Sequence, residues 1–157
     1  MNDYHEIIIE ELEKLLKEES PDEVAYAKAY VNYPEDYFKR PGEKIAGIPI
    51  PGEFNLLGPV ILPWLIGISM VVARDLGSAI YKKIIDKSIT ALFDKISKIL
   101  KKKKDTKINI TTKEDTIIEI TKALIKAGWN AGEAGKKAEE VWRYGENLGK
   151  RFIENAG

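Results

Sequence analysis

The chain of 157 residues holds few side chains of the kinds used for acid–base or nucleophilic chemistry. It has no cysteine, which excludes thiolate nucleophiles, thiolate metal sites and disulfides. Its one histidine, His5, is interpreted as a surface residue of a short acidic segment, not as a base or a ligand. With His5 interpreted as a surface residue, the chain has no histidine left for a Ser-His-Asp triad or a zinc site. No P-loop, dinucleotide-binding or GxSxG motif occurs either.

Carboxylates are numerous, but their spacing is that of solvated helix faces. Glu10, Glu13 and Lys17 stand three or four residues apart, as do Glu139 and Arg143. This spacing is typical of ion pairs within one helix. We therefore predict a non-enzymatic protein with no catalytic residue, no metal site and no cofactor. An enzyme that uses carboxylates alone is the alternative, and no motif points to it.

Lysines form a block in the middle of the chain. The formal net charge of zero hides a net charge of −7 over residues 1–53 and of +7 over residues 54–104. Two polyanions suit such a block: an anionic lipid membrane, or a nucleic-acid backbone as the alternative partner. Only one arginine, Arg74, lies in the block, so base reading is not expected. The lysines expected at an anionic surface are Lys82, Lys83, Lys101, Lys102, Lys103 and Lys104.

No side chain from Phe54 to Ala73 carries a charge. About 20 such residues suffice to cross a hydrocarbon core of about 30 Å. A helix that packs against other helices or against copies of itself needs the same apolar surface, so the sequence leaves a single span and a buried core open. The residues expected at this membrane or oligomer contact are Trp64, Leu65, Ile68, Ser69, Val72, Ala73 and Gly77.

The charge asymmetry around the apolar run favours a membrane-associated protein whose C-terminal part is cytoplasmic. The N-terminal residues lack the basic start of a secretory signal. A place in an assembled particle is the alternative localisation. The chain also has no glutamine and is rich in isoleucine, lysine and glutamate. This composition favours a hyperthermophilic source, although an AT-rich genome gives similar isoleucine and lysine usage.

The elements that must position these residues are predicted in four segments. Residues 1–40 form an acidic helical segment: a helix over 6–20, then a second helix with Ser20 as its N-cap and Pro21 at its first position. Tyrosines recur along this second helix as a core-facing seam, a membrane-interface belt or a base-stacking platform. They are Tyr26, Tyr30, Tyr33 and Tyr37. Pro34 is expected to break or kink the helix.

Residues 41–63 hold five of the seven prolines and predict an extended connector. A short edge strand in it is expected to pair with a second short strand at 106–112, the only β pairing predicted. Residues 64–104 predict one helix that continues to about residue 103, apolar at first and then basic and amphipathic.

Residues 105–157 predict the short strand and one further long helix, over 112–153. Thr111 and Glu114 match a capping box at its start. An apolar heptad register runs from Ile117 to Phe152 and indicates a coiled-coil seam. Its central residues are Leu124, Ala127, Ala131, Ala134, Ala138 and Val141. A helical hairpin that turns at 128–130 is the alternative, because glycine disfavours helix interiors.

Together these patterns predict a mainly α protein that assembles with copies of itself. The expected role is that of a structural subunit, or of a pore or anchor component, in a viral or cell envelope. The alternative is a soluble protein that coats nucleic acid or acts as a scaffold through its lysine-rich helix.

Overall fold

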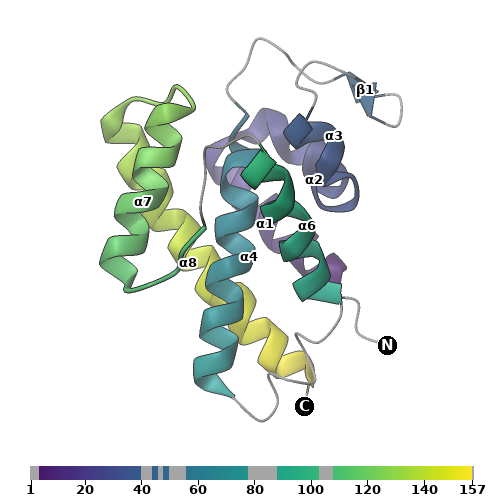
Figure 1. Cartoon of the computed structure of the whole chain (residues 1–157), viewed down its shortest axis with the longest axis vertical. Helices are drawn as coiled ribbons and strands as arrows, with labels where there is room; N and C mark the ends of the chain where they lie inside the picture. Colours follow the sequence, from purple (N-terminus) through teal and green to yellow (C-terminus); the bar gives the residue numbers. More distant parts are fainter. Residues whose placement is uncertain are drawn as a thin grey trace.

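The computed structural model describes residues 4–39, 44–45, 48–49, 56–77, 88–102 and 108–156. The fold is mainly helical, which confirms the predicted class. Helix α4 runs through the middle of the molecule, with α6 and α7 on opposite sides of it and α8 crossing behind it (Figure 1). The helices are α1 (Tyr4–Glu19), the 3-10 helix η1 (Pro21–Tyr26), α2 (Ala27–Asn32), α3 (Pro34–Lys39), α4 (Leu57–Leu76), α6 (Ser88–Lys102), α7 (Lys113–Lys126) and α8 (Ala131–Ala156).

One hydrophobic core draws on all four segments predicted from the sequence. Leu12, Ile61, Ile96 and Leu148 each come from a different segment, and each is 0% exposed. Helix α4 packs against α8, α1, α2, α6 and α7. The segments therefore belong to a single folding unit.

The N-terminal prolines act as the sequence predicts. Helix α1 ends at Glu19, and Pro21 opens the next element, although its first turns are 3-10. Helix α2 ends at Asn32, and Pro34 opens α3, because proline lacks the N–H that an interior position would donate. The tyrosine seam faces the core at Tyr30, whose ring meets that of Tyr37 edge-on at 4.6 Å.

The predicted single helix over 64–103 is wrong. Helix α4 starts at Leu57, runs through Pro63 and ends before Gly77, whose backbone leaves the helical region. Helix α6 packs back against α4. Phe93 of α6 lies beside Gly67 of α4, a contact that a straight helix cannot make. Two shorter helices packed side by side can bury the apolar residues of 64–103 as well as one long helix can. The apolar pattern therefore does not require one straight helix.

The extended connector is wrong at its C-terminal end, because residues 57–63 form the first two turns of α4. Pro59 falls in the first turn, where backbone N–H groups lack intrahelical partners in any case. The described β pairing is local: Lys44–Ile45 (β1) pairs antiparallel with Ile48–Pro49 (β2). Residues 108–111 form no strand, and the side chain of Ile110 packs at Gly67 instead.

The predicted helix over 112–153 is also wrong, and the alternative hairpin is right. Helix α7 ends at Lys126, and Gly128, two residues later, has a φ of 108°, which lies in the region that favours glycine. The amide of Gly128 donates to the carbonyl of Ile125, and that of Trp129 to Leu124, which is the Schellman pattern. Asn130 then caps α8 through the amide of Glu133 at 2.9 Å.

The capping box at the start of α7 lies one residue later than predicted. Thr112, not Thr111, is the N-cap, and its side chain accepts from the amide of Asp115 at 3.1 Å. The Thr111 amide instead donates to the hydroxyl of Thr116 at 3.2 Å.

Candidate interaction surfaces

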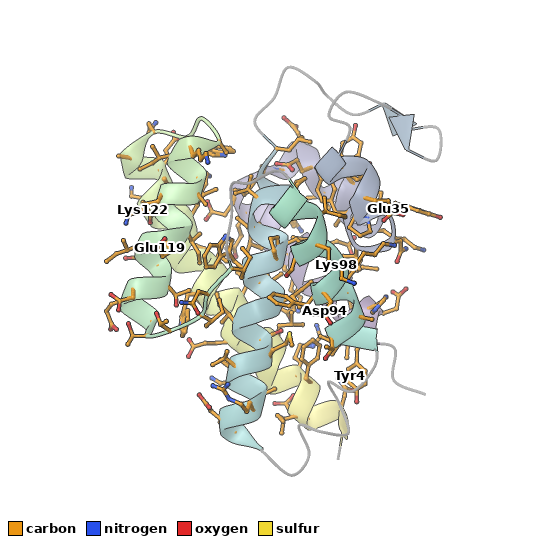
Figure 2. The ribbon with its side chains drawn as sticks, in the orientation of Figure 1. Tyr4, Glu35, Asp94, Lys98, Glu119 and Lys122 are labelled. Atoms are coloured by element: carbon orange, nitrogen blue, oxygen red, sulfur yellow. The ribbon has the colours of Figure 1, made fainter. Side chains whose placement is uncertain are left out.

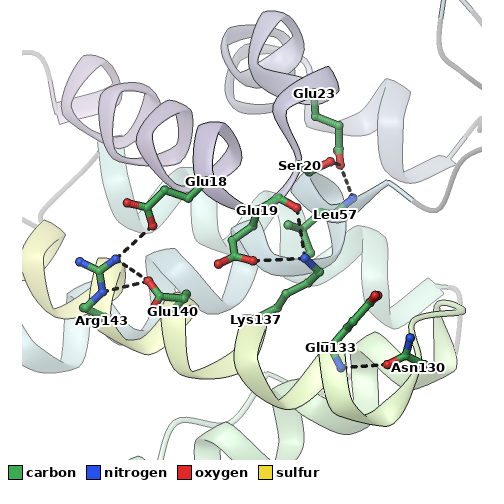
Figure 3. A network of polar contacts seen from close by, with 10 residues as sticks. All are labelled: Glu18, Glu19, Ser20, Glu23, Leu57, Asn130, Glu133, Lys137, Glu140 and Arg143. Atoms are coloured by element: carbon green, nitrogen blue, oxygen red, sulfur yellow. Dashed lines mark hydrogen bonds and ion pairs between the residues drawn. The ribbon is translucent and has the colours of Figure 1, made fainter.

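A buried carboxylate holds the start of the apolar helix. Glu23 is 4% exposed and accepts hydrogen bonds from the backbone amides of Leu57 at 2.7 Å and Gly58 at 2.9 Å. These amides form the positive end of the α4 dipole, which a carboxylate stabilises. The hydroxyls of Ser20 and Tyr30 also donate to Glu23, at 2.6 and 2.7 Å. Figure 3 shows Glu23 between Ser20 and Leu57.

The environment of Tyr30 follows from this contact. Burial, and then the negative charge of Glu23, raise the pKa of the Tyr30 hydroxyl well above its ordinary value. Gly58 packs flat on the tyrosine ring, since a Cβ there would lie 2.1 Å from Tyr30 Cε2. With four donors on its two oxygens, Glu23 is an anchor for α4 and has no geometry for general-base chemistry.

A second set of charges joins α1 to α8. Arg143 donates to Glu18 at 3.2 Å and to Glu140 at 2.9 Å, while Lys137 donates to the carboxylate of Glu19 at 3.2 Å (Figure 3). Carboxylate oxygens of Glu18, Glu19 and Glu140 come within 4.8 Å of one another. Each of the three has a cationic partner, with Arg143 shared by Glu18 and Glu140, so two cations face the three carboxylates. The hydrogen bond that Arg143 donates to Glu140 raises the pKa of Arg143.

The ion pairs differ in detail from those predicted. Arg143 pairs with Glu140 and Glu18, not with Glu139. Glu10 pairs with Arg151 across the α1–α8 interface, not within its own helix. A spacing of three or four residues identifies helix faces but does not identify the partner.

The residues predicted for membrane or oligomer contact lie mostly inside the fold, against α8. A Cβ atom on Gly145 would stand 2.6 Å from Ile68, and one on Gly149 would stand 2.8 Å from the carbonyl oxygen of Ser69. Glycines four residues apart therefore let the two helices approach closely. Of the predicted set, Val72 and Gly77 are half-buried, and the buried members are Trp64, Leu65, Ile68, Ser69 and Ala73.

Helix α4 is the one described helix that is long and apolar enough to cross a membrane by length and composition. Of its most apolar stretch, 72% is buried within the fold of the chain itself. The core helix of a soluble protein passes the same test of length and composition.

The predicted helix seam is divided between α7 and α8. Leu124 of α7 is buried, as are Ala134, Ala138 and Val141 of α8. Ala127 is half-buried beside the turn, and Ala131 is exposed on the first turn of α8. The four buried seam residues belong to the hydrophobic core of one chain. Gly145, which approaches α4 closely, belongs to the predicted register, whereas Gly149 lies outside it and was not predicted, although the two glycines form a G-x-x-x-G spacing.

The predicted lysines are only partly within the described residues. Four of them lie outside the described residues: Lys82, Lys83, Lys103 and Lys104. Lys101 and Lys102 are the last two residues of helix α6. Lys95 and Lys98 are exposed on the same helix, and Lys95 pairs with Glu35 at 3.1 Å. Figure 2 shows Lys98 and Asp94 on the outer side of α6. The apolar stripe of α6, which includes Ile89 and Ile96, is buried.

The outer face of α7 is the surface that sequence reasoning missed. Ile118 is 50% exposed and Ile125 is 45% exposed, two of the four large apolar side chains described as exposed. Glu119 and Lys122 project on the same outer side of the molecule (Figure 2). A hollow of about 520 Å³ lies along this face. Its lining residues are Asn109, Thr111, Asp115, Ile118, Glu119 and Lys122.

Comparison of the chain with protein families, with curated proteins and with solved structures gives no match. The fold and its surfaces define the chain as a mainly helical protein with one enclosed apolar helix and an apolar stripe on the outer face of α7.

Proposed function

We propose that the chain is a non-enzymatic structural protein that assembles with copies of itself through the outer face of its α7–α8 hairpin. The observation that carries this proposal is the exposure of Ile118 and Ile125 at a spacing of seven residues, two turns of the same helix. Two half-exposed isoleucines on one helix face form an apolar stripe of the kind that a second helix covers when helices pack side by side.

The acidic side chains named above make contacts between helices, and this supports a structural role. Glu23 anchors the start of α4, and Glu18, Glu19 and Glu140 are paired with cations that tie α1 to α8. These contacts tie the segments of the fold together, and the four donors on Glu23 leave it no open lone pair for acid–base catalysis.

Sedimentation velocity of the purified chain over a wide concentration range tests the proposal. We expect a reversible species heavier than the 17.7 kDa monomer, with a fraction that grows with concentration. A single 17.7 kDa species at every concentration contradicts it.

Attachment to an anionic membrane is a second candidate, favoured by the exposed Lys95 and Lys98 on a helix that ends in Lys101 and Lys102. Because α4 is largely enclosed by helices of the same chain, the attachment we propose is peripheral and electrostatic, not a span. Each lysine near such a surface contributes about 1 kcal/mol.

Co-sedimentation with vesicles tests this second candidate. We expect binding to phosphatidylserine vesicles, loss of binding in high salt, and no binding to neutral phosphatidylcholine vesicles. Binding to duplex DNA but not to anionic vesicles identifies a nucleic-acid backbone as the partner instead, and contradicts the membrane candidate.

A further inference from the structure

The charges on the outer face of α7 are arranged by sign along the helix. The N-terminal half carries Asp115 and Glu119, and the C-terminal half carries Lys122 and Lys126. At 100° per residue all four fall on the same flank of the stripe formed by Ile118 and Ile125. Asp115, Glu119 and Lys122 are exposed to solvent.

This arrangement is complementary to itself when a second α7 lies against it in the opposite direction. Such a pairing places Ile118 of one copy level with Ile125 of the other, and the reverse. Asp115 then stands two residues, about 3 Å along the axis, from the level of Lys126 in the second copy. Glu119 likewise stands two residues, about 3 Å along the axis, from the level of Lys122 in the second copy.

A two-fold axis between antiparallel helices brings the same flank of each helix together. Asp115 therefore meets Lys126 of the second copy, and the Glu119–Lys122 pair, which is closed within each helix at 3.4 Å, meets the same pair in reverse order. In a two-fold parallel pair the same flanks lie on opposite sides of the interface, so these charges would not meet and their complementarity would be lost. The formal net charge of the chain is zero, so two copies bring no overall repulsion to the contact.

The shape of the face agrees with the charges. The hollow of about 520 Å³ lies along the N-terminal half of α7, between that half and residues 109–111. In the antiparallel register this half lies opposite the C-terminal half of the second copy, where Ile125 projects with 45% of its surface exposed. Ile125 of each copy therefore comes level with Ile118, the apolar residue that lines the hollow of the other copy.

We propose that α7 is the self-association element of this protein and that two copies pair antiparallel and two-fold, Ile118 against Ile125, with acidic and basic halves exchanged. This inference rests on the proposed function and specifies its geometry. One helix face is smaller than the roughly 1,600 Å² of a standard interface, so the pair forms reversibly and the dimer fraction rises with concentration.

Cysteine cross-linking tests the direction of the pair, because the natural chain has no cysteine. Ile118→Cys and Ile125→Cys variants, each with a different tag, are oxidised mildly alone and as a mixture. We expect disulfide dimers between the two tags in the mixture and little from either variant alone. In the antiparallel pair, identical positions stand about 10 Å apart along the axis, beyond disulfide reach.

Charge exchange tests the pairing independently. Variant one carries Asp115→Lys and Glu119→Lys, and variant two carries Lys122→Glu and Lys126→Glu. We expect each variant alone to lose at least tenfold in dimer affinity, and an equimolar mixture of the two to form a 1:1 dimer. The changes at Asp115, Glu119 and Lys122 are on exposed side chains, and circular dichroism checks that both variants remain folded.

The outcomes separate this inference from the proposed function. If Ile118→Cys alone cross-links as readily as the mixture, the pair is parallel and the inference is wrong. If the wild type assembles but neither cysteine nor charge variants respond, another face mediates assembly, and only the inference falls. If the wild type is monomeric at every concentration, the inference and the proposed function both fall.

Discussion

The carboxylate of Glu23 lies 2.7 Å from the backbone nitrogen of Leu57, although 34 positions separate the two residues in the chain. This contact fixes the point at which the apolar helix begins, because the first amides of a helix have no partner within it. It also ties the acidic N-terminal segment to the centre of the core.

Glu23→Gln removes the charge but keeps the size of the side chain, so it tests how far the ionised carboxylate stabilises the fold. We expect the free energy of unfolding to fall by about 1–3 kcal/mol, the cost of weakening buried, charge-assisted hydrogen bonds. Urea unfolding measures it. Glu13→Gln, at an exposed position of α1, is the control and is expected to change stability by less than about 0.5 kcal/mol. Equal effects at both sites contradict the anchor.

Stability at alkaline pH is expected to depend on Tyr30. Because burial and Glu23 raise its pKa in the folded state, the unfolded chain loses the phenolic proton first. The free energy of unfolding therefore falls as the pH rises above about 10, the ordinary pKa of tyrosine, and is unaffected by this group below it.

Tyr30→Phe should flatten that alkaline loss while costing about 1 kcal/mol at neutral pH, because Glu23 loses a donor. Tyr33→Phe is the control, since Tyr33 is 46% exposed. Thermal unfolding between pH 8 and 11 gives both curves. If the stability of Tyr30→Phe falls with rising pH as steeply as that of the wild type, other groups cause the loss and the prediction is wrong.

The close approach of α4 and α8 predicts opposite results for two glycine substitutions in the same helix. Gly145→Ala places a methyl group 2.6 Å from Ile68 and should destabilise by about 1–3 kcal/mol through overpacking. Gly135→Ala meets nothing within 4 Å and should stabilise α8 by about 0.5–1 kcal/mol. Denaturant midpoints decide the matter, and destabilisation of similar size at both positions would refute the close contact.

The hairpin turn predicts a cost for any side chain at Gly128. Gly128→Ala must hold a φ of 108°, and we expect a loss of about 1–2 kcal/mol. Gly132→Ala is the matched control, because its added methyl group makes only an ordinary contact at 3.7 Å. Chemical unfolding compares the two variants, and a Gly128→Ala variant as stable as Gly132→Ala shows that the turn does not require a left-handed residue.

Local signals in the sequence predicted the first helix and the break at Pro34, because both depend on neighbouring residues alone. The long helices failed for a physical reason. An apolar register records which face is buried, and a hairpin buries the same face as a straight helix. Gly128 followed by Asn130 and Glu133 carried the stop and start signals of the turn, and these outweigh a continuous register.

The contacts between distant segments had no sequence signal of their own. The i, i+4 spacing predicted a pair between Glu139 and Arg143, but Arg143 pairs with Glu140 and with Glu18 on α1. Ile118 and Ile125 lie off the predicted seam, and only the folded hairpin shows that they face outward. Their spacing of seven residues can be read from the sequence, but the sequence does not show that this face of the helix is exposed.

The central claim is that the exposed stripe of α7 brings copies of the chain together. Light scattering of the wild type beside an Ile118→Glu, Ile125→Glu variant tests it most directly, with Ala91→Glu, exposed on α6, as the control. We expect a mass above 17.7 kDa, rising with concentration, for the wild type and the control, and 17.7 kDa for the double variant. A wild type that stays at 17.7 kDa, or a double variant that assembles as the wild type does, contradicts the claim.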